Sequence, residues 1–290
     1  MNVWRLVRPY AMVAPSIVTF GVFFIYPIFY MIYLSVHSWD FVSPEKPFVG
    51  LDNFAELAGS REFIEVLGNS FNYTLMTVSL TIVVSLFLAL WLNRKGVLYG
   101  IVQGAIFSPH IISLVSVSLV WMWLMDPQFG LLNWLLASIG LPRLEWLSHP
   151  DSSLLSLVLV AVWKGVGFNT LVFIAGLQSI PSELYEAAEL DESSRLTTWC
   201  RITLPMLSPT LFFLVIINLI GSFQVFETIA IMTQGGPVNS TNTLVYYIYQ
   251  YGFRFFKIGY ASAAGVVLLA VIGLLTLLYF KLLSKKVHYR

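Results

Sequence analysis

The residues EAAELDE at positions 186–192, followed by ITLP at positions 202–205, form a short charged stretch in a chain that is otherwise strongly apolar. Long apolar segments flank this stretch on both sides. We predict that these segments are membrane spans, since roughly 20 consecutive apolar residues are needed to cross a bilayer. The charged stretch is then a loop outside the membrane. A compact charged loop between two spans indicates a contact site for a soluble protein.

The amino-acid composition also indicates a membrane protein. Of the 290 residues, 58% are hydrophobic and 11% are charged, whereas soluble domains carry about 25% charged residues. So few charges cannot cover a water-facing surface. The net charge of +1 and the lack of a basic stripe give no indication of nucleic-acid binding. The single cysteine, Cys200, excludes an internal disulfide and a cysteine-built metal site.

Six apolar segments are long enough to cross a bilayer, so we expect an all-α integral membrane protein with one transmembrane domain over residues 1–290. The expected spans are residues 10–36, 73–92, 101–125, 154–177, 209–232 and 261–283, and the charged loop is residues 178–207. We expect Pro109 to kink the third span. Residues 131–139 are apolar but too short to cross, which predicts a helix lying on the membrane surface. The first segment is too long for a signal-peptide core and is expected to be retained.

The distribution of Lys and Arg predicts which side of the membrane each loop faces, because cytoplasmic loops are enriched in these residues. With the N-terminus inside, ten of them lie on the inner side and five on the outer side. The inner residues are Arg5, Arg8, Arg94, Lys95, Arg195, Arg201, Lys281, Lys285, Lys286 and Arg290, and the outer residues are Lys46, Arg61, Arg143, Arg254 and Lys257. We therefore expect both termini and the loop at 178–207 to be cytoplasmic.

Within that loop we predict two short helices joined at a bend. The first follows Pro181 and begins at Ser182, which we expect to cap it. Ser193 and Ser194 are expected to interrupt it and to cap a second helix over about residues 195–202. That second helix is expected to end at Leu204-Pro205, because a proline disfavours helix at the preceding residue.

The first of these helices has an acidic side and an apolar side. Acidic residues recur at every third position, at Glu183, Glu186, Glu189 and Glu192. A protruding knob with this mixed surface suits a groove on a soluble protein. The alternative is an amphipathic loop that lies on the lipid, but an acidic helix is poorly suited to an anionic inner leaflet.

Polar side chains inside the fifth span are candidates for a solute path, because polar groups are costly in lipid. The candidates are Asn218, Ser222, Gln224 and Glu227, with Phe223 and Phe226 between them. Sugars offer hydroxyls that hydrogen-bond and C–H faces that stack on aromatic rings, so this mixture suits a sugar. The alternative is that these groups join helices by hydrogen bonds. Lys164, in the fourth span, is either a charge on the path or the partner of a carboxylate such as Glu227.

The charged loop resembles the EAA loop of permease subunits of bacterial ABC importers. The resemblance rests on Glu186-Ala187-Ala188, on Ile202 sixteen residues after that glutamate, and on Leu204-Pro205. Further pieces resemble the carbohydrate-uptake branch, which includes maltose, multiple-sugar and glycerol-3-phosphate permeases. They are Ala14-Pro15, Tyr26-Pro27, VGLDNF at 49–54, Trp163-Lys164 and GGP at 235–237. Where the family usually has a glycine after the EAA residues, this chain has Glu192. The bend must therefore either form there without glycine, or move toward Ser193 while Glu192 stays helical.

The resemblance implies a type I ABC importer permease in the bacterial cytoplasmic membrane. Its partners would be a second homologous permease, two ATPase subunits and an extracytoplasmic solute-binding protein. It assigns ATPase coupling to Glu186, Ala187, Ala188, Leu190, Asp191, Glu192, Leu196, Ile202, Leu204 and Pro205. The solute would be a sugar, or alternatively glycerol-3-phosphate or a related phosphodiester. The chain has no Walker-type GxxxxGK[ST] motif, so we expect it to bind no cofactor and to leave ATP and Mg to the partner ATPase.

Two other classes fit the sequence less well. An ion-coupled secondary transporter would show matching broken helices in two inverted halves and buried coupling carboxylates, yet Glu227 is the one acid inside an expected span. A membrane enzyme would need a cluster of His, Asp or Ser at one membrane face. The residues of these types inside and beside the spans are dispersed.

Overall fold

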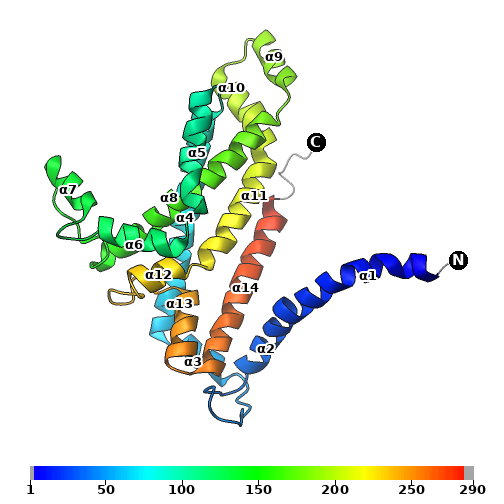
Figure 1. Ribbon diagram of the computed structural model, residues 1–290, viewed down its shortest axis with the longest axis vertical. Helices are drawn as coiled ribbons and strands as arrows, with labels where there is room; N and C mark the ends of the chain where they lie inside the picture. The colour runs from blue at the N-terminus through cyan, green and yellow to red at the C-terminus, as the bar shows by residue number, and fades with distance from the viewer. Residues whose placement is uncertain (1–2, 284–290) are drawn as a thin grey trace. The chain divides into compact units, whose positions relative to one another are not determined.

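The computed structural model describes residues 3–283, and these are helical apart from the connecting loops and one isolated β-bridge (Figure 1). Lys285, Lys286 and Arg290, which contribute to the charge count above, lie outside the described residues. The chain divides into two units, Met1–Phe63 with Tyr247–Ala270 and Ile64–Tyr246 with Val271–Arg290.

The first unit contains the N-terminal helices and the start of the last helix. Its elements are α1 (Val3–Phe20), the π-helical turn η1 (Gly21–Ile25), α2 (Tyr26–Ser35), α3 (Asp52–Gly59), the π-helical turn η3 (Gln250–Arg254) and the first part of α14 (Ile258–Leu283). Two glycines let α14 approach α2 closely, because a Cβ at Gly259 would overlap the His37 carbonyl and one at Gly265 would overlap the Met31 sulfur. Asn53 Nδ2 donates to the carbonyl oxygens of Ser35 at 2.8 Å and of His37 at 3.1 Å, which ties α3 to the C-terminal end of α2 and to the loop that follows it.

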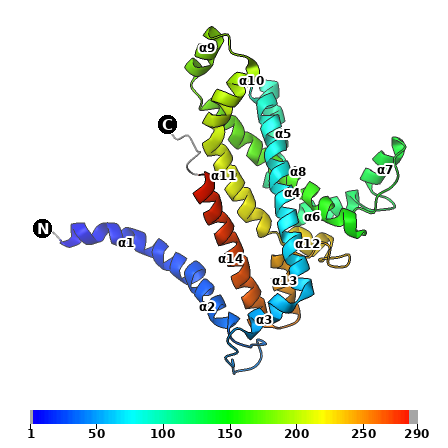
Figure 2. The ribbon, with the colours of Figure 1, turned by 180° about the vertical axis from the view of Figure 1, so that it is seen from behind.

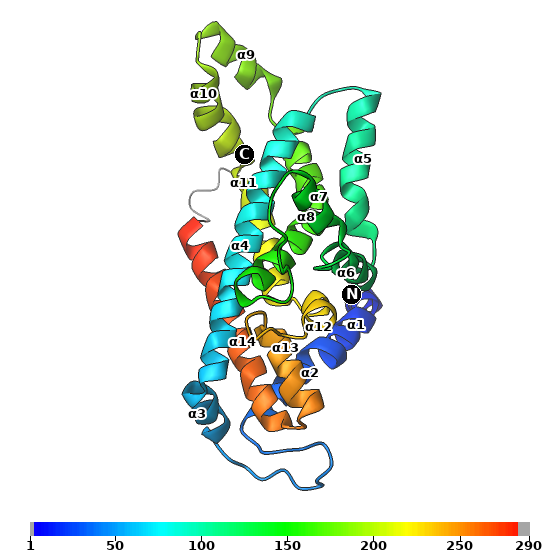
Figure 3. The same ribbon diagram turned by 90° about the vertical axis from the view of Figure 1, so that its left-hand side faces the viewer.

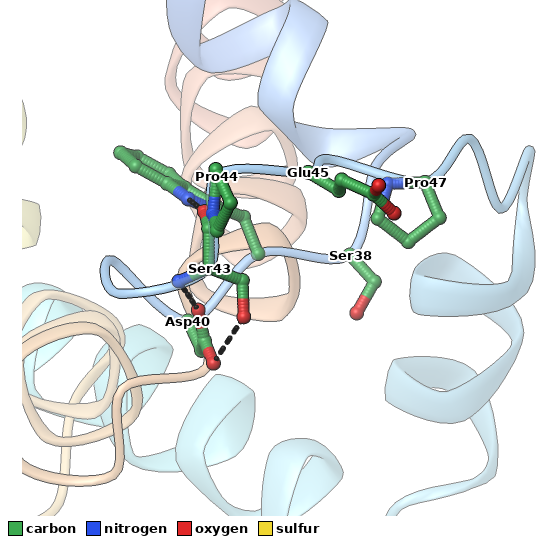
Figure 4. Close-up of a pocket in the computed structure, with 7 residues that line it drawn as sticks. Ser38, Asp40, Ser43, Pro44, Glu45 and Pro47 are labelled. Atoms are coloured by element: carbon green, nitrogen blue, oxygen red, sulfur yellow. Dashed lines mark hydrogen bonds between the residues drawn. The ribbon is translucent and has the colours of Figure 1, made fainter.

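The loop between α2 and α3 closes on itself through one carboxylate (Figure 4). Asp40 Oδ1 accepts hydrogen bonds from Ser43 N at 2.7 Å and Val42 N at 3.1 Å, and Oδ2 accepts one from Ser43 Oγ at 3.0 Å. These bonds, led by the one from the Ser43 backbone, favour the ionised carboxylate and lower the pKa of Asp40. The loop lines a shallow hollow with Pro44, Glu45 and neighbouring residues.

The second unit is built on three long helices. These are α4 (Arg61–Leu92), seen from behind as a long helix in Figure 2, α8 (Pro150–Gln178) and α11 (Leu204–Phe223). Their apolar faces meet in a core that includes Leu92, Phe173 and Leu214. Gly176 of α8 faces Thr210 of α11, and a Cβ at position 176 would overlap the Thr210 side chain. The glycine therefore permits the close crossing of α8 and α11.

Shorter helices complete this unit. They are α5 (Val97–Ile111), α6 (Leu114–Leu124), α7 (Leu131–Ser138), α9 (Ser182–Leu190), α10 (Arg195–Thr198), the π-helical turn η2 (Trp199–Thr203) and α12 (Glu227–Met232), while α13 (Leu244–Tyr249) begins in this unit and ends in the first. The helix α7 falls on the short apolar run for which we predicted a helix. By length and composition, five described helices could cross a membrane, or six if α5 and α6 together make one span.

The expected third span differs from the structure. Instead of one helix over residues 101–125 with a kink at Pro109, the helices α5 and α6 meet at 101° (Figure 1). The helix α5 continues through Pro109. Pro109 has no N–H to donate to Ala105 O, and Ser108 Oγ donates to that carbonyl instead, at 2.8 Å. The break comes after Ile111 instead.

The bounds of two other helices also differ from the expected spans. Helix α4 begins at Arg61, well before residue 73. The second loop helix does not end at Leu204-Pro205 but continues through η2 into α11. The Leu204 N–H bonds to Trp199 O, one residue further back than in an α-helix, so the helix changes its bonding register immediately before the proline that cannot donate.

Candidate functional site

A cavity of about 520 Å³ lies within the second unit. Residues of α4, α5, α6, α8, α11 and α12 line it, together with the turn between α11 and α12. Of the seven residues that the sequence suggested for a solute path, five line this cavity: Lys164, Asn218, Ser222, Gln224 and Glu227. The remaining two do not, since Phe223 is buried in the protein and Phe226 packs near the ring of Tyr246, with 6.3 Å between centroids.

Two asparagines join α8 to α11 at the cavity wall. Asn218 Nδ2 donates to Asn169 Oδ1 at 2.6 Å and to Leu214 O at 2.7 Å. Asn169 is buried, and its Nδ2 donates to Gly165 O at 2.9 Å. Asn218 therefore connects two helices and also lines the cavity, and its place on a solute path stays a prediction.

Lys164 is held by the backbone at the break between α5 and α6. Its Nζ donates to Ile112 O at 2.6 Å, Pro109 O at 3.2 Å and His110 O at 3.3 Å. Carbonyls at a helix C-terminus lack helical partners, and a cation suits that end of the helix. Lys164 thus satisfies carbonyls that the break leaves free.

The suggested pairing of Lys164 with Glu227 is wrong. Glu227 is exposed in the first turn of α12. Within residues 3–283, no hydrogen bond or ion pair to its carboxylate is found. The two side chains line the same cavity, yet the ammonium contacts carbonyl oxygens and the carboxylate is left open to the cavity.

Other cavity residues escaped the sequence reasoning. They include Tyr73, Thr77, His110, Phe168 and Asn169. The rings of His110 and Phe168 are stacked, with their centroids 4.9 Å apart. Asn169 carried a usable signal, since it is an amide in the middle of an apolar span. Tyr73 and Phe168 carried none, because aromatic residues are common throughout the expected spans.

The charged loop forms a helical hairpin, α9 followed by α10, which lies beyond the ends of α8 and α11 (Figures 1 and 3). Helix α9 ends in a Schellman motif. Ser193 N donates to Ala188 O at 2.9 Å and Glu192 N donates to Glu189 O at 3.0 Å. Glu192 takes the left-handed conformation that this motif requires, with φ of 51°. Of the two possibilities for the bend, the structure shows the first, because the bend forms at Glu192 itself, although a residue with a Cβ resists this conformation.

The predicted caps of the hairpin are half confirmed. Ser194 caps α10, because its Oγ accepts from Thr197 N at 3.2 Å. Ser182 does not cap α9, since it is already the first helical residue and Pro181 occupies the cap position without a side-chain hydrogen bond. Tyr185 Oη of α9 and Thr203 Oγ1 of η2 lie 3.1 Å apart, which ties the two arms of the hairpin together.

Most residues suggested for ATPase coupling are on the hairpin surface. Leu190 and Leu196 are 86% and 72% exposed, so the hairpin surface offers apolar as well as acidic side chains. The other exposed members are Glu186, Ala187, Asp191, Glu192 and Leu204. Ala188 is buried inside the hairpin, and Ile202 and Pro205 are half-buried. These three residues support the exposed surface rather than form it.

Comparisons with known proteins agree on one family. Residues 81–289 match the family described as "Binding-protein-dependent transport system inner membrane component". The arabinooligosaccharides transport system permease protein AraP of Bacillus subtilis is 36% identical, over 94% of this chain and 88% of that protein. The sn-glycerol-3-phosphate transport system permease protein UgpA of Yersinia pestis is 33% identical, over 97% of this chain and 96% of that protein.

A solved structure gives the same answer for the fold. A bacterial alginate ABC transporter in complex with an alginate pentasaccharide-bound periplasmic protein contains a chain with a TM-score of 0.85 and 26% identity, and the match covers 98% of both chains. The resemblance stated from the EAA residues and the all-helical permease fold are both confirmed. A multi-pass permease of this kind is the non-catalytic transmembrane part of its transporter. This chain therefore belongs to the inner membrane permeases of binding-protein-dependent ABC importers, among relatives of the carbohydrate-uptake branch.

Proposed function

We propose that this chain forms half of the translocation path for a sugar that an extracytoplasmic binding protein delivers. The main support for this proposal is the cavity of about 520 Å³, in which hydroxyl, amide and carboxylate groups lie beside the Phe168 ring. A sugar can hydrogen-bond to the polar groups and stack a C–H face on the ring. AraP is described as an arabinooligosaccharide permease and the solved relative carries an alginate oligosaccharide on its periplasmic protein. Both support an oligosaccharide or sugar as the solute.

In this proposal the hairpin at 178–207 couples the permease to an ATPase. Its exposed acid Glu186 and exposed leucines Leu190 and Leu196 offer charged and apolar contacts to a soluble partner. The Lys and Arg count of ten against five supports a cytoplasmic hairpin and cytoplasmic termini. ATP and Mg would be bound by the two ATPase subunits, and a second homologous permease would complete the path.

The mechanical connection runs along one continuous helix. Helix α10 passes through η2 into α11, which carries Asn218 and Ser222 at the cavity. Closure of the ATPases would move the hairpins, and α11 would transmit that movement to the cavity wall. We propose that six spans, formed by α1–α2, α4, α5–α6, α8, α11 and α14, then rock between inward-open and outward-open states.

Glycerol-3-phosphate is the second candidate solute, because UgpA is 33% identical over nearly the full length of both chains. The same transporter architecture would serve either solute, so the choice depends on the chemistry of the cavity.

Reconstituted vesicles test the proposed function. The complete importer should take up its solute only with the ATPase subunits and ATP present, and uptake should stop when either is withheld. As a control, vesicles containing the complex and a non-hydrolysable ATP analogue should show no sustained uptake. Uptake that continued under an ion gradient alone would instead establish a secondary transporter and overturn the importer proposal.

A further inference from the structure

The cavity is lined by one lysine and one acid, and the two are used differently. A lysine ammonium has three N–H donors and no acceptor. The Nζ of Lys164 lies within hydrogen-bond distance of the carbonyl oxygens of Pro109, His110 and Ile112. These three acceptors account for all three donors. The ammonium is therefore part of the wall, and no donor is left on it for a solute.

The amide donors of the paired asparagines are also occupied. Asn218 Nδ2 bonds to Asn169 and to Leu214 O, and Asn169 Nδ2 bonds to Gly165 O. An anionic group, such as a carboxylate or a phosphate, needs N–H or O–H donors aimed at it. The asparagine pair and the lysine, which would ordinarily supply them, are already hydrogen-bonded within the protein.

Glu227 offers the opposite chemistry. Its exposed carboxylate lines the cavity, and within residues 3–283 no partner to that carboxylate is found. An ionised carboxylate accepts hydrogen bonds from hydroxyl donors. It repels other anions, more strongly as the surrounding dielectric constant falls, as it does between helices in a membrane.

We propose that Glu227 makes this cavity selective against anions, so that the path takes an uncharged, hydroxyl-rich solute and rejects carboxylated or phosphorylated ones. The inference rests on the proposed function and narrows its substrate class. It separates this chain from UgpA, which is described as a glycerol-3-phosphate permease, and from the alginate transporter that shares its fold.

A cysteine placed in the cavity can measure this selectivity without knowledge of the solute. Gly221 lines the cavity, and a Cβ built on it meets nothing within 4 Å, so Gly221→Cys fits there. The exposed Cys200 is the one native thiol and is removed by Cys200→Ser. The full-length chain, assembled with its partner subunits in vesicles, is then labelled with methanethiosulfonate reagents that differ only in charge.

The three reagents carry a trimethylammonium, a sulfonate or a neutral hydroxyl group. Each rate constant is divided by the rate of the same reagent with free 2-mercaptoethanol. We expect the cationic reagent to react at least about tenfold faster than the anionic one, since a unit charge at cavity distance in a medium of low dielectric has an effect of this order. Glu227→Gln, which keeps the shape of the side chain, should bring the ratio down to unity or below, because the Lys164 ammonium then lines the cavity without the Glu227 carboxylate.

Two further variants sharpen the measurement. Gln224→Glu adds a second acid to the cavity lining and should raise the ratio. Glu145→Gln removes an exposed acid that does not line the cavity and should leave the ratio unchanged. Equal corrected rates in the parent, or a ratio that Glu227→Gln does not move, would overturn the proposal. So would a cysteine that even the neutral reagent cannot label, because the cavity would then be closed to solutes.

The ratio of labelling rates tests the charge selectivity of the cavity, and the vesicle uptake assay tests the importer function, so either proposal can be overturned without the other. If uptake does not require ATP while the ratio behaves as expected, the importer function falls and the charge selectivity of the cavity stands. The opposite outcome is that uptake requires ATP while the parent importer, with Gly221 and Glu227 unchanged, transports glycerol 3-phosphate as well as it transports an uncharged sugar. In that case the selectivity is overturned and the importer function stands.

Discussion

Glu192 shows how a single residue can fit its position poorly and still leave the fold intact. It occupies the left-handed position of the Schellman motif that ends α9, with φ of 51°. For a residue with a Cβ this conformation costs roughly 1 kcal/mol relative to glycine. The two hydrogen bonds of the motif and the Ser194 cap that follows hold the bend against this cost. The apex of the hairpin is therefore a weak point in an otherwise well-bonded element.

Glu192→Gly should stabilise the hairpin by up to about 1 kcal/mol, because glycine adopts the left-handed conformation without steric cost. Part of this gain is offset by the greater freedom of glycine in the unfolded chain. We expect the amides of residues 192 and 193 to exchange with deuterium up to about fivefold more slowly, measured by mass spectrometry on the assembled complex.

A second glycine substitution in the same helix provides the control. Glu189→Gly places glycine inside α9, where it costs about 1 kcal/mol relative to a good helix former. In Glu189→Gly the amides of α9 should exchange faster than in the parent. In Glu192→Gly the amides at the apex should exchange more slowly. If both variants speed exchange, the strain at Glu192 does not limit the stability of the hairpin.

At the scale of elements, the sequence predicted helices well and helix ends poorly. Apolar runs located the long helices and the short α7, because hydrophobic length is a local property. The break between α5 and α6 could not be placed, since it depends on contacts far along the chain. Ser108 satisfies the carbonyl that Pro109 frees, and Lys164, more than fifty residues later, satisfies the carbonyls after it. The pair Ser208-Pro209 repeats the first of these devices in α11, with Ser208 Oγ donating to Pro205 O at 2.6 Å.

Lys164→Met should destabilise the corner between α5 and α6. It leaves three carbonyls without the donor they share. Of the three residues, Pro109 is buried, and an unsatisfied buried acceptor costs about 1–3 kcal/mol. We expect a loss within this range and a lower melting temperature of the detergent-solubilised complex, followed by size-exclusion fluorescence. Lys164→Arg, which keeps the charge and several donors, should recover part of the loss.

Lys257→Met is the matched control for that change. Lys257 forms an exposed ion pair with Glu56, with 3.4 Å between Nζ and Oε1. Exposed pairs contribute no more than about 1 kcal/mol, so this variant should melt close to the parent. Equal melting of the Lys164→Met and Lys257→Met proteins would show that the corner does not depend on Lys164.

For the whole molecule, the two candidate sites differed in how far the sequence could predict them. The hairpin is contiguous in sequence, so the EAA spacing could propose its coupling residues, which stay a prediction, while the burial of a residue such as Ala188 could not be read from that spacing. The cavity draws on six helices, so the sequence found only those members that are polar within an apolar span. Phe223 and Phe226 were misplaced because α11 ends at Phe223 and the chain turns before α12, which breaks the helical spacing assumed across residues 218–227.

The hairpin gives the whole molecule its proposed connection to an energy source, and Glu186 is the residue that tests it. Glu186 is exposed on α9, so Glu186→Lys reverses a surface charge without disturbing the core. Like charges placed together at an interface cost several kcal/mol, so ATPase bound to the purified permease should fall by more than about tenfold. Glu145→Lys, an equal reversal at an exposed acid outside the hairpin, should leave ATPase binding unchanged. Both variants should insert into the membrane at the parental level, and undiminished co-purification of the ATPase with Glu186→Lys would remove this residue from the coupling contact.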